Sequence, residues 1–475
     1  MTKITCFAVT AVVLCCTAQA KIIFAPVFTD NMVLQREKPV TIWGVAAPQE
    51  EVSVSFAGQT VKTKANADGA WKLQLAALMA SKENRTLTAT GKENTLTLKN
   101  VLVGEVWLCS GQSNMEQPLW NKNPRFRDRN GFLVSQFANV PLIRFALMAK
   151  YDFSTQPRTD YTMQWEVCSP ETAKKLSAVS YYYGLTLFQN LDIPVGLITS
   201  HWGGTRIEPW TPPCGFESVP SLKGILDALG NLKERTSPEE KNLHQQPTVL
   251  FNRMIYPFVP YTLRGAIWYQ GESNRGEGML YCDKMHALLN GWKKVFENPE
   301  LKFYFVQLAP FRYGNNPQAL PEIWEAQQTF AEEEKDAGMA VINDVGNIND
   351  IHPYDKEIVG RRLALLALKR DYGRAEIKAD APTLKTHMIE NGQFVLTFNN
   401  ASEWYTTGNQ PIKNFKVAGA DGTPVEAKAT IKDAQLIVGA ESVKNPKQLF
   451  YMWNETDEGN LFNEACLPLG AFRIK

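Results

Sequence analysis

The sequence predicts an α/β protein whose central part is flanked by two all-β regions. Three observations support this fold class. Residues 21–100 alternate apolar and polar side chains between turn signals, which is typical of short antiparallel strands. Residues 101–375 alternate short unbroken apolar runs with longer helical patterns, as expected for a parallel sheet covered by helices. Residues 376–475 return to a period of two and predict a second β-region.

The first twenty residues have the pattern of a cleavable secretion signal. Lys3 supplies a short basic start, residues 4–16 are mostly apolar, and Ala18-Gln19-Ala20 matches a cleavage site. The sequence therefore predicts cleavage after Ala20 and a secreted or periplasmic protein; a cytosolic N-terminal strand is the alternative. The apolar run is too short for a comfortable membrane span, and no later stretch predicts one.

Charge and cysteine content exclude several classes of protein. The chain has 50 Lys and Arg against 49 Asp and Glu, and loss of Lys3 with the leader leaves 49 of each. This balance does not favour nucleic acid as a partner. Five cysteines remain after the leader: Cys109, Cys168, Cys214, Cys282 and Cys466. They contain no C-x-x-C pair, so no zinc site is expected, although one or two disulfides would fit.

Within residues 21–100, the strands follow each other at hairpin spacing. Val52, Val54 and Phe56 alternate with serines, and Trp71, Leu73 and Leu75 repeat the pattern. Turns are expected at Gly58-Gln59 and at Asp68-Gly69, and further strands surround Gly91. These features predict a small β-sandwich.

The central part predicts five buried strands and four helices. Strands are expected at 106–108, 195–198, 266–268, 303–306 and 340–342, and helices near 176–190, 280–297, 324–335 and 356–371. Ligands of open α/β sheets bind beyond the carboxyl ends of the strands, so residues directly after each run are the candidates for chemistry. In the C-terminal region, strands are expected near 394–398, 436–438 and 449–453.

Ser113 is the candidate nucleophile. It follows the run Val106-Trp107-Leu108 and a turn containing Gly111, which would expose its hydroxyl beside backbone N–H groups. The alternative is that Ser113 only caps a helix.

A serine nucleophile needs a base, and the chain has five histidines. His201 and His352 follow predicted strands, whereas His244 lies in a polar loop, His286 in a predicted helix and His387 in the C-terminal β-region. Asp350 precedes His352 closely enough to orient its ring. A purely structural histidine is the alternative at each position.

Two further segments after strands offer groups that could stabilise a developing oxyanion. The paired Gly203 and Gly204 let backbone N–H groups approach a ligand closely. Gln270, after the run 266–268, carries a side-chain amide donor.

These motifs together resemble the sialate O-acetylesterases, a group within the SGNH hydrolases. The resemblance is carried by Gly111-Gln112-Ser113-Asn114-Met115, Gly203-Gly204-Thr205, Trp268-Tyr269-Gln270-Gly271-Glu272-Ser273-Asn274 and Asp350-Ile351-His352-Pro353, and it extends to Asn31-Met32-Val33-Leu34-Gln35-Arg36, Asn460-Leu461-Phe462-Asn463 and Leu467-Pro468. It implies a flavodoxin-like three-layer α/β/α domain over 101–375, between a β-sandwich at 21–100 and a β-region at 376–475.

The resemblance also implies roles for individual residues. Ser113 is expected to be the nucleophile and His352 the general base, with oxyanion donors from the Ser113 and Gly204 N–H groups and from Gln270. The family's usual acid stands three residues before the histidine, where this chain has Asn349, so Asp350 either completes a triad or is dispensable to a Ser–His dyad. No cofactor and no metal are expected.

The implied reaction is removal of O-acetyl groups from carbohydrates, above all from sialic acid. Asn114, Trp202, Arg206, Glu272 and Asn274 are the candidate substrate contacts, with Arg206 suited to a carboxylate and Trp120, Trp210 and Tyr269 as further aromatic candidates. Core packing of the aromatic residues and an ion pair of Arg206 are the alternatives. An acetyl-xylan or hemicellulose esterase is the alternative function, and a non-catalytic carbohydrate-binding protein is the alternative of another class.

Overall fold

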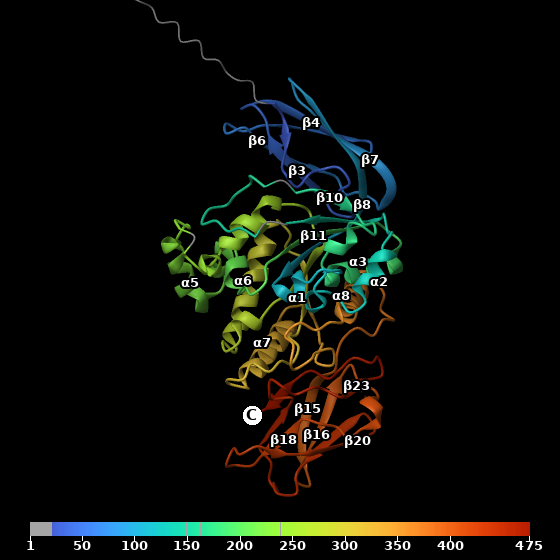
Figure 1. The fold of residues 1–475 in the computed structure, drawn as a ribbon, viewed down its shortest axis with the longest axis vertical. Coiled ribbons are helices and arrows are strands. Elements are labelled where there is room, and N and C mark those ends of the chain that lie inside the picture. Colours follow the sequence, from blue (N-terminus) through green and yellow to red (C-terminus); the bar gives the residue numbers. More distant parts are fainter. Residues whose placement is uncertain (1–20, 149–150, 162, 238) are drawn as a thin grey trace, which may run out of the picture.

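The computed structural model describes residues 21–148, 151–161, 163–237 and 239–475 (Figure 1). An N-terminal β-region, a mixed central part and a C-terminal β-region follow one another along the long axis. The expected leader at residues 1–20 lies outside the described residues. All five remaining cysteines are free thiols, so the disulfides that the sequence left open are not formed in this structure.

The N-terminal region forms two sets of antiparallel strands. β1 (Ile23–Phe24), β3 (Val40–Val45) and β6 (Ala70–Leu75) make one sheet, and β4 (Glu51–Phe56) pairs with β5 (Gln59–Lys64) and β7 (Ser81–Thr90). The predicted alternation is confirmed, since Val52, Val54 and Phe56 are buried. The Asp68-Gly69 turn is confirmed too: Gly69 has φ +83°, and a Cβ there would lie 2.5 Å from the Ala46 oxygen.

One long strand joins this region to the centre. The first part of β8 (Thr95–Gly111) pairs with β7 and, in parallel, with β2 (Val33–Gln35). Its second part runs parallel to β11 (Val195–His201) and β12 (Gly265–Tyr269). The expected boundary near residue 100 therefore falls inside a continuous strand.

The central sheet has the order β10-β9-β11-β8-β12-β13-β14. Its remaining strands are β9 (Ile143–Leu147), β10 (Trp165–Val167), β13 (Lys302–Val306) and β14 (Ala337–Ala340), and all pairs are parallel except β10 with β9. The strand expected at 340–342 ends at Ala340 instead. β9 was not predicted because Arg144 interrupts its apolar run; the Arg144 side chain is buried and donates to the Pro141 oxygen at 2.6 Å.

The four expected helices are present: α3 (Ala178–Leu191), α6 (Leu280–Val295), α7 (Ala319–Glu333) and α8 (Lys356–Asp371). α7 begins at Ala319, before the expected residue 324. Pro321 does not prevent this earlier start, because it lies in the first turn of the helix, where its missing N–H breaks no helical hydrogen bond. α3 packs against α8, and α6 packs against α7.

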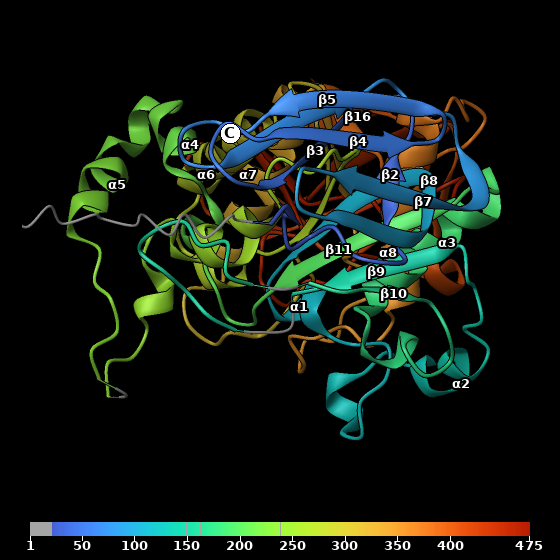
Figure 2. The ribbon, with the colours of Figure 1, turned by 90° about the horizontal axis from the view of Figure 1, so that it is seen from above.

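Shorter helices lie in the connections. They are α1 (Ser113–Glu116), α2 (Gly131–Gln136), α4 (Pro213–Glu217), α5 (Lys223–Ala228), the π-helical η7 (Phe251–Ile255) and the 3₁₀ segments η1 (Pro124–Phe126), η2 (Ala173–Lys175), η3 (Glu208–Trp210), η4 (Pro220–Leu222), η5 (Leu229–Asn231), η6 (Leu243–Gln245), η8 (Tyr256–Phe258), η9 (Glu272–Asn274) and η10 (Thr407–Asn409). Seen from above, α5 and α2 protrude on opposite sides of the sheet (Figure 2). Across the described residues, no helix is both long and apolar enough to cross a bilayer.

The C-terminal region is built from antiparallel strands. β15 (Thr383–Glu390), β16 (Gln393–Asn399), β21 (Gln435–Gly439) and β20 (Lys428–Lys432) form one sheet, β19 (Val425–Glu426), β18 (Phe415–Ala418), β22 (Gln448–Tyr451) and β24 (Phe472–Ile474) a second, and β17 (Trp404–Thr406) pairs with β23 (Leu461–Asn463). The three expected strands are thus confirmed. This region contacts the central part through hydrogen bonds such as Gly314 N–H to Glu455 Oε1 at 2.8 Å.

Candidate active site

Ser113 stands at the carboxyl end of the central strand β8. Gly111 ends this strand with φ +146°, and a Cβ on it would lie 2.2 Å from the Tyr269 oxygen, so the close approach of β8 and β12 requires glycine. The Gln112 N–H donates to that same Tyr269 oxygen at 3.0 Å. The chain then turns into α1, and Ser113 is left half-buried as its first residue.

The Gly203-Gly204 turn packs directly against Ser113. A Cβ on Gly203 would lie 3.2 Å from the Ser113 Cβ, and the Gly203 N–H donates to Glu116 Oε2 at 2.5 Å. Gly204 has φ +73° and faces open space. Within the described residues, the backbone N–H groups of Ser113 and Gly204 have no protein acceptor. Two unpaired backbone donors therefore lie in the Ser113 turn and in the glycine turn packed against it, and stabilisation of an oxyanion requires such donors.

His352 lies in the loop between β14 and α8, and this loop is tied to the nucleophile turn. Asn114, the residue after Ser113, donates from Nδ2 to the Ile351 oxygen at 3.0 Å. Burial lowers the pKa of His352, and the charges of Lys356 and Arg125 lower it further, against the opposing carboxylates of Asp350 and Glu116. The imidazole is therefore neutral at neutral pH, which is the form that a general base needs.

Asp350 lies beside His352 without a hydrogen bond to its ring. Its Oδ1 is 3.7 Å from His352 Nδ1, which is too long for a hydrogen bond. The carboxylate instead accepts from the His352 backbone N–H at 3.0 Å and from the Tyr354 hydroxyl at 2.7 Å. Asp350 thus stabilises the His352 loop. The effect of its replacement on kcat decides between a Ser–His–Asp triad and a Ser–His dyad.

We expect Asp350→Asn to lower kcat for p-nitrophenyl acetate by only about tenfold, because the ring is not hydrogen-bonded to the carboxylate. A triad aspartate whose loss reverses the histidine tautomer costs about 10⁴-fold. Steady-state kinetics compare this variant with Asp350→Ala. A loss for Asp350→Asn near the larger figure would show that the carboxylate swings onto His352 and completes a triad.

The contacts of Gln270 do not fit the expected role as an oxyanion donor. The side chain is fully buried, and its Nε2 donates to the Thr205 oxygen at 3.0 Å and to Asn274 Oδ1 at 2.8 Å. Its Oε1 accepts from the Tyr281 hydroxyl at 2.8 Å. Both amide hydrogens are therefore committed, and Gln270 braces the turn that follows Gly204.

Arg206 and Asn274 belong to a closed ion-pair network rather than to an open substrate site. The Arg206 guanidinium binds the carboxylates of Glu208 and Glu277, and Lys284 Nζ binds the same two carboxylates at 2.7 Å each. Asn274 Nδ2 also donates to both, at 3.0 Å each. Two cations thus neutralise two anions, so the expected use of Arg206 for a substrate carboxylate and of Asn274 for substrate contact is not supported.

Asn114 and Glu272, two further candidate substrate contacts, are tied to each other. Asn114 Nδ2 donates to Glu272 Oε1 at 2.6 Å, and Asn114 Oδ1 accepts from Lys356 Nζ at 2.6 Å. Asn114 is buried, and both hydrogens of its amide are already donated within the protein. Lys356 was not predicted as a site residue from the sequence. Its position four residues after His352 was the one indication that it could lie near the site.

Trp202, a candidate substrate contact, directly precedes the Gly203-Gly204 turn and forms a wall of aromatic rings with two neighbours. Its ring stacks on His244 at a centroid distance of 4.7 Å and packs against Tyr151 at 5.5 Å. The Tyr151 hydroxyl donates to Glu116 Oε1 at 2.5 Å, so one carboxylate orients both this wall and the Gly203 turn. Glu116 was also missed, although its position three residues after Ser113 places it on the same face of α1.

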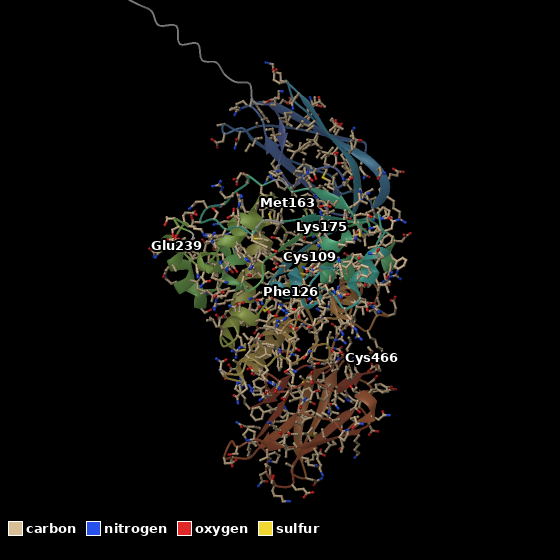
Figure 3. All side chains as sticks on the ribbon, viewed as in Figure 1. Cys109, Phe126, Met163, Lys175, Glu239 and Cys466 are labelled. Carbon is tan, nitrogen blue, oxygen red and sulfur yellow. The ribbon has the colours of Figure 1, made fainter. Side chains whose placement is uncertain are left out.

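The other aromatic candidates differ in how deeply they are buried. Trp210 and Tyr269 are fully buried, so the core alternative is correct for them. Trp120 is half-buried, 4.8 Å from the Phe132 ring and 4.2 Å from the Arg127 guanidinium. Phe126, labelled in Figure 3, lies on the central part of the chain with its ring 6.2 Å from that of His352.

Two other histidines are not joined to Ser113 by any of these contacts: His201 ends β11 opposite Gly111, and His286 lies in α6. His201 is buried, and neither of its ring nitrogens has a hydrogen-bond partner among the described residues. Burial lowers the pKa of His201 as well. His286 lies with Cys282 and Glu333 in a group whose ligand atoms are within 4.8 Å of one another, spaced as metal ligands could be. This group shares no residue with the Ser113 site.

Comparison with known proteins places the whole arrangement in a family. Residues 103–352 match the family of carbohydrate esterases described as sialic acid-specific acetylesterase. The sialate O-acetylesterase of Mus musculus is 29% identical over 453 residues, covering 83% of this chain and 82% of the relative. That of Homo sapiens is 30% identical over 394 residues, covering 76% and 73%.

Among solved structures, a carbohydrate acetylesterase from Xanthomonas citri matches with a TM-score of 0.85 and 32% identity, covering 96% of this chain and 99% of the other. This similarity includes both β-regions, and it sets aside the non-catalytic alternative. The chain therefore belongs to the sialic acid-specific acetylesterase family of carbohydrate esterases, and it is a carboxylic ester hydrolase.

Proposed function

We propose that this protein is a serine carbohydrate O-acetylesterase in which Ser113 attacks the acetyl carbonyl and His352 takes the proton of its hydroxyl. The observation that carries the proposal is the placement of Ser113 beside two free N–H groups, with the His352 loop bound to the next residue through Asn114. The reaction is then acyl transfer through a covalent acetyl-enzyme.

The steps follow from this geometry. The Ser113 and Gly204 N–H groups hold the oxyanion of the tetrahedral intermediate, each contributing about 3 kcal/mol by analogy with other hydrolases. His352 returns its proton to the departing sugar oxygen. The same ring then activates the water that releases acetate and regenerates Ser113.

For the substrate we propose an O-acetylated sialic acid, the class that the names of the mammalian relatives indicate. Its carboxylate needs a cation that Arg206 does not supply. A pocket of about 580 Å³ next to the His352 loop is lined by Arg125, Arg127 and Arg129. The Arg125 side chain is 66% exposed, and the carboxylate that it approaches, Asp350, is 3.8 Å away. A bidentate guanidinium suits a planar carboxylate.

We expect Arg125→Ala to raise KM for O-acetylated N-acetylneuraminic acid by about tenfold, the loss of one charge-assisted hydrogen bond. The methyl ester of the same sugar carries no carboxylate, so its KM stays unchanged. Arg206→Ala is the matched control and affects both substrates equally. Equal loss on acid and ester in Arg125→Ala would refute carboxylate recognition by this residue.

A hemicellulose acetylesterase is the second candidate. The observation that favours it is the Tyr151–Trp202 aromatic wall, since aromatic faces suit neutral sugar rings of any kind. Acetate release measured side by side on acetylated sialic acids, acetyl-xylan and acetylated monosaccharides decides between the two. Faster turnover of acetyl-xylan than of the acetylated sialic acids would move the assignment to hemicellulose.

The architecture and location that we propose complete this assignment. Right-handed crossovers would place α6 and α7 on one face of the sheet and α3 with α8 on the other, giving an SGNH-type three-layer domain. The proposed domains are 21–100, 101–375 and 376–475. We further propose cleavage after Ala20 and a secreted or periplasmic location, tested by N-terminal sequencing of the mature protein.

A further inference from the structure

Lys356 is a fully buried lysine in an unfavourable position. It is the first residue of α8, where the helix dipole disfavours a cation. Its Nζ donates to Asn114 Oδ1 at 2.6 Å and lies 5.4 Å from the centre of the Tyr269 ring. Within the described residues it forms no ion pair. Burial of an ammonium without a direct counter-ion costs stability, so such a residue is a candidate for function.

Asn114 connects this ammonium to both halves of the proposed active site. The amide accepts from Lys356 and donates to Glu272 Oε1 at 2.6 Å and to the Ile351 oxygen at 3.0 Å. Asn114 directly follows Ser113, and Ile351 directly precedes His352. The amide thus fixes the distance between nucleophile turn and histidine loop, and Lys356 fixes the orientation of the amide.

The charges around these groups come from several elements. Lys356 faces the carboxylates of Glu272 in η9, Asp128 before α2 and Asp350 in the His352 loop. His352 faces Lys356, Asp350, Arg125 and Glu116. Burial lowers the pKa of Lys356 to about 7, against the opposing effect of the three carboxylates. Burial raises the pKa of Glu272, whose buried Oε2 has no hydrogen-bond partner in the part of the chain that the structure describes.

We propose that Lys356 is a positioning residue that aligns the His352 loop with Ser113 through Asn114 and keeps His352 unprotonated when the solution becomes mildly acidic. The proposal deepens the proposed function, because it assumes that His352 is the base.

The direction of the effect follows from the charges. As pH falls through about 7, Lys356 takes up a proton, and its positive charge then disfavours a second proton on His352. His352 therefore remains a neutral base to a lower pH than it would alone. Removal of the ammonium raises the pKa of His352 and moves the acidic limb of the pH–rate profile to higher pH.

The test compares Lys356→Met with Lys38→Met. Lys38 is a matched control, because its Nζ also donates to an asparagine oxygen, Asn298 Oδ1 at 2.9 Å, and burial lowers its pKa. For Lys356→Met we expect the acidic limb of kcat/KM for p-nitrophenyl acetate to move up by about one pH unit. The limb of Lys38→Met stays where it is in the unmodified enzyme. An unmoved limb in Lys356→Met would overturn the proposal.

Glu272→Gln provides a second variant in case Lys356→Met does not fold. A glutamine oxygen still accepts a hydrogen bond from Asn114. Loss of the Glu272 carboxylate lowers the pKa of Lys356, so Lys356 becomes charged only at a lower pH. The acidic limb then moves up, by less than in Lys356→Met, and a limb that moved down would contradict the proposal.

A readout without turnover separates this proposal from the proposed function. In a Ser113→Ala background, the NMR signal of the His352 ring is followed against pH with and without Lys356→Met. An upward shift of the titration on loss of Lys356 supports the coupling even if another residue proves to be the nucleophile. Identical titrations would refute the coupling while leaving Ser113 and His352 in their roles.

Discussion

Replacement of Ser113 by alanine is expected to lower kcat for p-nitrophenyl acetate by about 10⁴-fold or more, as loss of the nucleophile does in other serine hydrolases. The fold should be unaffected, because Ser113 is half-buried and, within the described residues, its hydroxyl makes no hydrogen bond. Stopped-flow and steady-state measurements of p-nitrophenol release check the rate, and thermal unfolding checks the fold.

Ser110→Ala is the matched control for this variant. Ser110 lies on the same strand three residues earlier, and its buried Oγ has no hydrogen-bond partner within the described residues. Its replacement should leave kcat within about twofold of the unmodified enzyme, the range of uncoupled substitutions. Near-normal turnover in Ser113→Ala would remove Ser113 from the nucleophile role.

Replacement of His352 by alanine is expected to cost nearly as much as loss of Ser113, again about 10⁴-fold or more in kcat. His201, the alternative base from the sequence, is buried, and its ring nitrogens have no hydrogen-bond partner among the described residues. Because nucleophile and base act as a unit, the double variant Ser113→Ala/His352→Ala should be no slower than either single variant. The double variant is therefore measured beside both.

His387→Ala serves as the control for histidine loss, since His387 lies on the exposed face of β15 in the C-terminal region. It should retain full turnover. If His201→Ala abolished turnover while His352→Ala retained it, the role of base would pass to His201.

The parts of the site that the sequence predicted are those determined by strand ends. Ser113 and the Gly203-Gly204 turn each follow a buried apolar run, and adjacent parallel strands bring such positions together at one edge. Gly111 is a further example, because the pairing of β8 with β12 leaves no room for a Cβ. Local patterns and sheet topology are sufficient for predictions of this kind.

Sequence reasoning could not foresee which partner each side chain of the site contacts. Gln270 and Arg206 have the right chemistry for an oxyanion or a carboxylate, but Tyr281, Thr205, Glu208 and Glu277 already occupy them. These partners lie on distant parts of the chain, so no local pattern reveals them. Lys356 was not predicted as a site residue because a lysine in a first helical turn is ordinarily exposed, whereas this one is fully buried.

The most direct measurement of the central claim is covalent labelling with a fluorophosphonate, followed by identification of the modified peptide by mass spectrometry. Such a reagent reacts with a serine only when the hydroxyl is activated by a base. We expect one label, on Ser113, that is lost in His352→Ala and retained in Lys38→Met. Labelling of another serine, or labelling of Ser113 at an unchanged rate in His352→Ala, would contradict a Ser113–His352 esterase.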